Sequence, residues 1–383
     1  MNMNFEFDHG PTTVSRDQES RAIDEELRRV GVDHPMVVTD QELSASGVTD
    51  PVVESLTRSR YDYVLFDRVE ANPTAELVEA GRDVALGEEI DGIVAIGGGS
   101  SIDTGKAISL LVPNGGNWTS YEGTPDTEHG SLPLIAIPTT VGTGSEVTRA
   151  SVITDADRNT KMTTTTKELY PDVALLDPSL LTSLPPSVTA ATGMDSLTQA
   201  IEAYLSPDAS PITDALAVRA TRMIAENLTA AVLRADQDAL AAMQVATTME
   251  GMAFDNAGLG LVHGLSEPVG GKFHTGHGIT NAVLLPEVLE FNLVACPNKY
   301  ANLAGAMGVR TSGLSTRQSG TELIGEIRGL ADEIGIPPGL SELGVEEGVI
   351  PELVEEAYDH VNSKNNPREY SKRDLERIYH RAL

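Results

Sequence analysis

Histidine, carboxylate and amide side chains gather in two segments of the 383-residue chain. Three of the eight histidines, His263, His274 and His277, lie close together among glycines. Asp195 and Gln199 stand four residues apart in a stretch with helical spacing, so both side chains project from one helix face. One carboxylate and two imidazoles can hold a catalytic divalent metal with positions left open for a substrate. The two segments therefore predict a metal site, whereas Asp195 and Gln199 alone would suit a solvated helix face.

A glycine-rich loop follows an apolar run that ends at Ile96. Glycines at 97–99 allow a tight turn and the close approach of a ligand to the backbone. A helix that begins at about Ser101 would offer unpaired N–H groups and its positive dipole end to a pyrophosphate. This loop predicts a dinucleotide site, and a merely tight strand–helix turn is the alternative.

The pair Gly105-Lys106 invites comparison with the phosphate-binding loop of nucleoside triphosphatases. In that motif the first glycine would fall at position 100, which is Ser100 here. Ala107 stands where the motif requires Ser or Thr for magnesium. The sequence therefore argues against a nucleoside triphosphatase.

A second loop, residues 138–148, also follows an apolar run and is rich in hydroxyl groups and glycine. Such a loop suits a phosphate, a ribose or a nicotinamide amide, although a loop that caps its own helix would look alike. Two such loops at the carboxyl ends of neighbouring strands are where an open α/β sheet binds a dinucleotide. The second loop therefore supports the interpretation of the first.

Short apolar runs alternate with helical stretches in the first half of the chain, which predicts a doubly wound α/β domain with a parallel sheet. A helical pattern over 18–30 ends at Gly31, and residues 151–164 read as a β-hairpin. From about residue 188 the chain is rich in Ala, Leu, Glu and Met at helical spacing. We expect an α/β domain at 1–185 and an all-helical domain at 186–383. The runs expected as strands are 36–38, 63–66, 93–96 and 134–137.

The charge of the chain is strongly acidic, with 57 Asp and Glu against 27 Lys and Arg and a formal net charge of −30. Such a surface repels nucleic-acid phosphates and anionic lipid, so we expect neither partner. Arg outnumbers Lys about three to one. Few lysine stems and many carboxylates predict a protein adapted to a salty cytoplasm, where salt screens the repulsion, and an acidic mesophilic protein is the alternative.

Cysteine content and hydropathy predict a soluble cytoplasmic protein. Cys296 is the single cysteine, so the chain can form neither an intrachain disulfide nor a thiolate metal cluster. Residues 1–16 are polar and acidic, unlike a signal peptide. The sequence has no apolar run long enough for a membrane span.

Several segments in the same order resemble the iron-containing (group III) alcohol dehydrogenase family, over roughly residues 30 to 300. The resemblance implies a Rossmann-like dinucleotide-binding domain and an all-α metal-binding domain, as in dehydroquinate synthase-like folds. It also implies hydride transfer between an alcohol and a nicotinamide cofactor, a homodimer as the usual minimum assembly, and, with the acidic charge, a halophilic archaeal source. The matching segments are 97–106, 138–146, 177–178, 193–195, 201–204, 277–278, 281–282 and 285–286.

The resemblance places metal ligands at Asp195, His263 and His277, with Fe²⁺ expected first and Zn²⁺ or Mn²⁺ as alternatives. The family usually has histidine at the positions of Gln199 and Glu267, so this chain departs from the pattern twice. Gln199 would either ligate through its amide oxygen or leave three protein ligands. A neutral oxygen donor lowers the affinity for iron or zinc and can change the metal.

The resemblance also implies the cofactor site. Asp40 follows the first predicted strand, where a carboxylate accepts hydrogen bonds from a ribose 2′-hydroxyl and repels a 2′-phosphate, which favours NAD over NADP. We expect Asp103, Lys161 and His274 to act in catalysis, with His274 as a proton relay or a mere loop residue. The residues expected to bind the cofactor are Asp40, Asn72, Gly97, Gly98, Gly99, Ser100, Ser101, Asp103, Thr139, Thr140, Thr143, Ser145 and Lys161.

The sequence thus predicts a metal-dependent NAD(P)-linked alcohol dehydrogenase acting on a small alcohol or aldehyde. A metal-independent enzyme resembling the maleylacetate reductases is one alternative. A glycerol-phosphate dehydrogenase or dehydroquinate-synthase-like enzyme is another, but such sites need several Lys and Arg, and Lys272 is the main candidate near the histidines. A nucleotide-binding protein without catalytic activity is the third.

Overall fold

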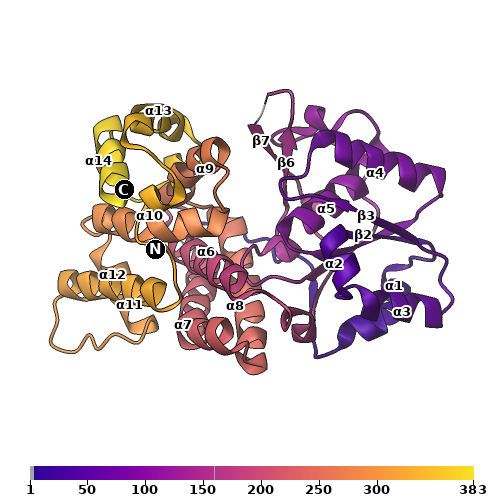
Figure 1. The fold of residues 1–383 in the computed structure, drawn as a ribbon, viewed down its shortest axis with the longest axis horizontal. Coiled ribbons are helices and arrows are strands. Elements are labelled where there is room, and N and C mark those ends of the chain that lie inside the picture. Colours follow the sequence, from indigo (N-terminus) through magenta and orange to yellow (C-terminus); the bar gives the residue numbers. More distant parts are fainter. Residues whose placement is uncertain (1–3, 159) are drawn as a thin grey trace. The chain divides into compact units, whose positions relative to one another are not determined.

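The computed structural model describes residues 4–158 and 160–383 (Figure 1). The chain forms two compact units. The first contains residues 9–140 and 144–183, and the second contains residues 141–143, residues 184–383 and the N-terminal residues up to Asp8. Residues 1–3, at the start of the segment expected to lack a signal peptide, and residue 159, in the turn of the expected hairpin, lie outside the described residues.

The first unit is built on a parallel sheet with the strand order β1-β8-β5-β4-β2-β3. All four expected strands are present, and β1 and β8 are strands that the sequence analysis missed. Polar, exposed residues form β1, so it shows no apolar run. The strands are β1 (Thr12–Ser15), β2 (Pro35–Asp40), β3 (Val64–Val69), β4 (Gly92–Gly97), β5 (Leu134–Pro138) and β8 (Val173–Leu176).

Helices cover both faces of this sheet, which is why its central strands read as unbroken apolar runs. In β4, Ile93 and Ala95 pack in the same core as side chains of α4 and α5, while Val94 and Ile96 pack with side chains of α1 and α3. The expected helix at 18–30 is a 3₁₀ turn followed by α1, and Gly31 ends it with φ 78°. The helices are α1 (Ile23–Val30), α2 (Gln41–Ser46), α3 (Asp50–Arg58), α4 (Ala75–Gly87) and α5 (Gly99–Asn114).

The expected hairpin is confirmed as the antiparallel pair β6 (Ala150–Asp155) and β7 (Thr160–Thr165). Ser151 pairs with Thr164, and Thr154 pairs with Lys161. The pair forms a separate two-stranded sheet beside α5. The hairpin therefore lies next to α5, the helix that follows the glycine-rich loop.

From residue 184 onward, the described part of the second unit contains helices joined by loops and no β-strand, as expected. Helix α6 packs against α7, α8 and α10, so it lies at the centre of this bundle. No helix in the described ranges is both long enough and apolar enough to cross a membrane. The helices are α6 (Pro186–Leu205), α7 (Pro211–Arg234), α8 (Gln237–Ala257), α9 (Leu261–Phe273), α10 (His277–Asn292), α11 (Pro297–Ala306), α12 (Thr316–Glu333), α13 (Ile350–Asp359) and α14 (Lys372–Ala382).

Candidate metal centre and dinucleotide site

Helix α6 presents a row of polar side chains inside the helical unit. Asp195, Gln199 and Glu202 follow one another at spacings of four and three, so they share one face of the helix. Their relative exposures are 4%, 4% and 7%. Buried carboxylates require partners, and those of Asp195 and Glu202 lie next to residues of α9 and α10.

The two histidines stand near the starts of α9 and α10. Nε2 of His263 and Nε2 of His277 each lie 3.8 Å from Oδ1 of Asp195. One ligand atom from each of the three residues falls within 4.8 Å of the others. Gly278 permits this approach, because a Cβ atom there would meet the backbone of Ala191 on α6. The structure therefore brings together the three predicted ligands that carry a charge or an imidazole.

Each histidine has a carboxylate behind its other ring nitrogen. Nδ1 of His263 lies 2.6 Å from Oε2 of Glu202, and Nδ1 of His277 lies 3.7 Å from Oε1 of Glu267. Burial of His263 acts against its charged form, but the charge and hydrogen bond of Glu202, together with the charges of Asp195 and Glu267, outweigh burial and raise the pKa of His263. Carboxylates at Nδ1 favour the tautomer whose Nε2 lone pair is available to a metal.

Two amide side chains complete the cluster. Oε1 of Gln199 is buried, and no hydrogen-bond donor among the described residues reaches it. Nδ2 of Asn281 lies 2.7 Å from Oδ1 of Asp195, 3.2 Å from Nε2 of His263 and 3.1 Å from Nε2 of His277. A buried acceptor without a donor costs free energy, and a cation would satisfy it. The donor set therefore fits a divalent metal.

The dinucleotide candidates lie along one edge of the parallel sheet. The chain runs from β2 to β3 and then crosses to β4 on the other side of β2, so β2 and β4 form the topological switch point. Asp40 ends β2, and Gly97 ends β4. Ligands of open α/β sheets bind outside the carboxyl ends of strands at such a point. The side chain of Asp40 also accepts a hydrogen bond from Leu43 N at 2.8 Å and so caps the N-terminus of α2.

Helix α5 begins at Gly99, two residues before the expected start, and no side chain caps its N-terminus. Gly97 has a φ of 149°, and a Cβ atom there would lie 2.6 Å from Cβ of Ser101. A Cβ atom at Gly98 would lie 3.3 Å from Thr140. Glycine is therefore required at 97, and the open backbone N–H groups of the first turn suit an anionic group.

Asp103 joins α5 to the loop and the hairpin that follow β5. Its carboxylate accepts hydrogen bonds from the Ser145 hydroxyl and, at 2.9 Å, from Val152 N. Burial raises the pKa of Asp103, and the charges of Lys106 and Lys161 act in the opposite direction. Lys161 is exposed on β7. The structure thus groups Asp103, Ser145 and Lys161 at one end of α5.

The remaining expected cofactor residues follow other strands. Asn72 follows β3 and has a φ of 60°. Thr139 and Thr140 follow β5, and Thr139 N donates to Gly97 O at 2.9 Å. Thr143 belongs to the short segment that groups with the helical unit. Asn72 and Thr139 therefore follow the ends of parallel strands at the edge where Asp40 and Gly97 stand.

Comparison with known proteins decides the family. The family described as "Iron-containing alcohol dehydrogenase" matches residues 11–178, and "Fe-containing alcohol dehydrogenase family, C-terminal" matches residues 189–383. This chain belongs to the iron-containing alcohol dehydrogenase family. The sequence-based expectations of an oxidoreductase acting on alcohols, with a nicotinamide cofactor and a divalent metal, are thereby confirmed.

Named relatives cover nearly the whole chain. The NAD-dependent methanol dehydrogenase of Bacillus methanolicus is 40% identical over 358 residues, which span 93% of this chain and 94% of the relative. The 1,3-propanediol dehydrogenase of Citrobacter freundii is 40% identical over 385 residues, spanning 100% of this chain and 97% of the relative. A crystal structure of 1,3-propanediol oxidoreductase superposes with a TM-score of 0.97 at 37% identity, covering 99% of this chain and 100% of that one.

Two polar residues of this alcohol dehydrogenase's metal cluster were missed as site residues. Glu202 stands seven residues after Asp195 and Asn281 stands four after His277, so both lie on the faces that carry predicted ligands. That spacing could have identified them. His274 is exposed, ends α9 with a φ of 53°, and is not among the three grouped ligand residues. Its catalytic role stays a prediction.

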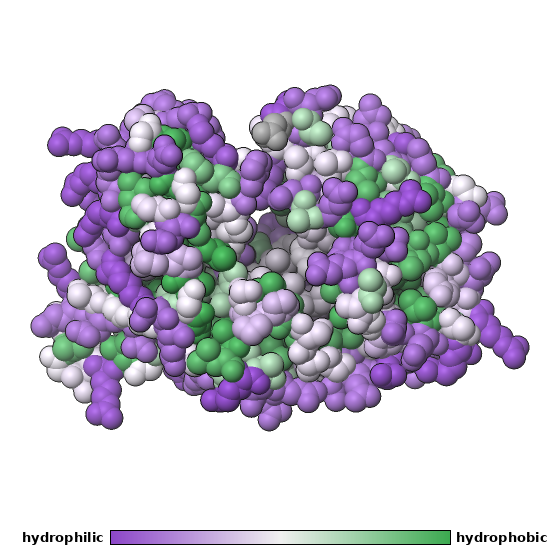
Figure 2. All heavy atoms as spheres, in the orientation of Figure 1, coloured by the Kyte–Doolittle hydropathy of each residue, from purple (hydrophilic) through white to green (hydrophobic). Residues whose placement is uncertain are grey.

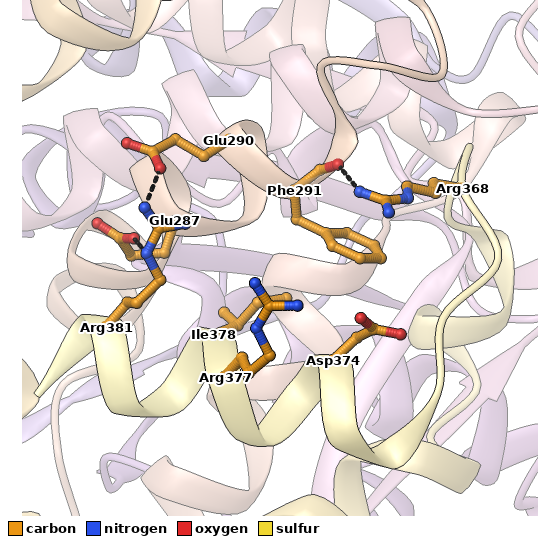
Figure 3. A pocket seen from close by; sticks show the side chains of 8 residues that line it. All are labelled: Glu287, Glu290, Phe291, Arg368, Asp374, Arg377, Ile378 and Arg381. Carbon is orange, nitrogen blue, oxygen red and sulfur yellow. Dashed lines mark hydrogen bonds and ion pairs between the residues drawn. The ribbon is translucent and has the colours of Figure 1, made fainter.

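A cavity of about 160 Å³ elsewhere in this dehydrogenase's helical unit contains no histidine (Figure 3). Arg381 bonds Glu290 at 2.5 Å, and Arg328 bonds both Glu287 and Glu290 at 2.6 and 2.9 Å. The guanidinium of Arg368 lies over the ring of Phe291 at 3.9 Å. These ion pairs connect α10 with α12 and α14 and pair both glutamates with arginines.

Proposed function

We propose that Asp195, His263 and His277 hold the catalytic divalent metal of this dehydrogenase and that Gln199 supplies the fourth protein donor through Oε1. The grouping of three ligand atoms within 4.8 Å, each imidazole backed by a carboxylate, is the observation that carries the proposal. A metal bound there would act as a Lewis acid that lowers the pKa of an alcohol. Iron is the first candidate, and zinc or manganese would suit the same nitrogen and oxygen donors.

The chain's own residues are proposed to orient the groups bound at each of the two sites. Glu202 fixes the tautomer of His263 through its 2.6 Å contact with Nδ1. The Asn281 amide donates to Oδ1 of Asp195 at 2.7 Å and so holds that carboxylate beside the two Nε2 atoms. Asp103, Ser145 and Lys161 are proposed to hold the nicotinamide end of the cofactor, and exposed His274 to accept or release the proton at the surface.

We propose NAD as the preferred cofactor. The supporting observations are the Asp40 carboxylate at the switch point and the uncapped start of α5 next to it, which suits a pyrophosphate. The remaining expected contacts come from Asn72, from Gly97 to Ser101 and from Thr139, Thr140 and Thr143. NADP would place its 2′-phosphate against the Asp40 charge.

Asp40→Gly is expected to reduce the preference for NAD over NADP about tenfold. The substitution removes the repulsion, of about 1.4 kcal/mol, between the Asp40 carboxylate and the 2′-phosphate of NADP. The measurement is the ratio of kcat/KM for the two cofactors with one alcohol. Glu42→Gln, on the exposed first turn of α2, is the matched control. An unchanged ratio in Asp40→Gly would remove Asp40 from the selectivity mechanism.

We infer a small alcohol or aldehyde as the substrate, a homodimer or larger homo-oligomer, and a salty cytoplasm, in a halophilic archaeon, as the setting. Two relatives carry the names of methanol and 1,3-propanediol dehydrogenases, which supports a small substrate. The net charge of −30 and the many hydrophilic residues on the face drawn in Figure 2 support the salt adaptation. A melting temperature that falls in multimolar KCl would contradict it.

The test of this function combines elemental analysis with turnover. Protein purified in multimolar KCl is expected to contain about one iron, zinc or manganese per chain and to reduce NAD with simple alcohols. Chelation should abolish turnover, and metal should restore it. Full activity without metal would place the enzyme with metal-independent relatives of the maleylacetate-reductase type, and no turnover on any alcohol or aldehyde would favour a nucleotide-binding protein without catalysis.

A further inference from the structure

The two histidines of the metal centre share one arrangement. Each turns Nε2 toward Oδ1 of Asp195 at 3.8 Å and has a glutamate carboxylate on its Nδ1 side. Glu202 is nearly buried, whereas the side chain of Glu267 is 25% exposed. The resemblance to the family places histidine at position 267, so the carboxylate behind His277 is a feature of this chain.

Helix geometry fixes where Glu267 stands. It follows His263 by four residues on α9, so both side chains project from the same face of that helix. Gly264 lets residues 362–365 pack against α9, because a Cβ atom there would meet Ser363. Lys272 of α9 is paired with Glu352 of α13. The spacing on α9 thus places Glu267 on the face of His263, where its carboxylate lies 3.7 Å from Nδ1 of His277.

We propose that Glu267 is a positioning residue, which holds the Nδ1–H tautomer of His277 and directs its Nε2 to the metal. This inference rests on the metal site proposed above. At 3.7 Å the Glu267–His277 contact is an ion-pair distance rather than a full hydrogen bond. A metal held at Nε2 would make the Nδ1 proton more acidic and so strengthen its interaction with the Glu267 carboxylate, as in the carboxylate–histidine–metal arrangement of other sites.

The charge of Glu267 also offsets the weak donor at position 199. Asp195 is the only carboxylate in the proposed ligand set, and Gln199 is neutral. Glu202 and Glu267 place two further negative charges behind the imidazoles, which increases their basicity toward a cation. The Glu267 charge acts on His277 across their 3.7 Å contact.

The test compares metal affinity in two variants of position 267. Glu267→Gln keeps the shape and an acceptor oxygen but removes the charge, and Glu267→Ala removes both. We expect the dissociation constant for the metal, measured by competition with a chelator, to rise about 10–100-fold in Glu267→Gln and at least as much in Glu267→Ala. The absorption bands of bound Co²⁺ should shift in both, because the ligand field at His277 changes.

The matched control is Glu352→Gln, which removes a carboxylate paired with α9 but 61% exposed. It should bind metal as the unaltered chain does. If the unaltered chain binds metal and both position-267 variants show the same affinity and the same Co²⁺ spectra, the proposed role of Glu267 is wrong while the metal site stands. An unaltered chain that binds no metal would overturn the metal site and this inference together. Equal melting temperatures of the metal-free proteins would show that the variants are folded.

Discussion

Replacement of His263 by alanine is expected to lower kcat/KM for alcohol oxidation by roughly 10³-fold or more. The substitution removes one of two imidazole donors, and loss of the metal removes several kcal/mol of transition-state stabilisation. It also leaves Oε2 of Glu202 without its 2.6 Å partner in a buried site. An unpaired buried group costs about 1–3 kcal/mol, so the free energy of unfolding should fall as well.

The measurements are steady-state kinetics with NAD and elemental analysis of the purified variant. His380→Ala is the control, since His380 lies on α14 in the same unit with 41% of its side chain exposed. That variant should keep its metal and its activity. Should His263→Ala retain both a full metal content and wild-type turnover, the assignment of the metal to this cluster would be wrong.

Helical spacing and the clustering of histidines are local information, so the sequence could predict that Asp195 and Gln199 share a helix face and that His263 and His277 lie close together. Asp195 and Gln199 are four residues apart. Residues seven apart on a helix also share a face, and that spacing would have identified Glu202. Which carboxylate faces which imidazole depends on how α6, α9 and α10 pack, and that is tertiary information. The sequence therefore indicated His263 and His277 but not the glutamates behind them.

The strands of the sheet could likewise be predicted only where the information is local. Buried strands such as β4 show as apolar runs, and β8 is such a run although the sequence analysis did not assign it, whereas β1 is short, exposed and polar. Strand order is set by crossovers, so the position of β2 between β3 and β4 could not be read from the chain. That order puts Asp40 beside Gly97, which turns two separate motifs into one candidate cofactor edge.

Substitution of Gln199 is expected to have the second large effect, in which the metal-free protein becomes more stable and the affinity for metal falls. Its Oε1 atom is buried without a donor among the described residues, an arrangement that destabilises the metal-free protein. Gln199→Leu removes that polar atom with little change in volume. We expect the free energy of unfolding of the metal-free protein to rise by about 1–3 kcal/mol and the metal affinity to fall at least about tenfold.

Gln199→His is the complementary change, because it restores the histidine that the family resemblance places at this position. An imidazole is a stronger donor to iron or zinc than a neutral amide oxygen, so the affinity should rise at least about tenfold above that of the unaltered chain. Chelator competition and denaturant unfolding of the metal-free proteins measure both effects. Equal metal affinities in Gln199→Leu and the unaltered chain would mean that Asp195, His263 and His277 bind the metal without it, and the unpaired Oε1 would then need another explanation.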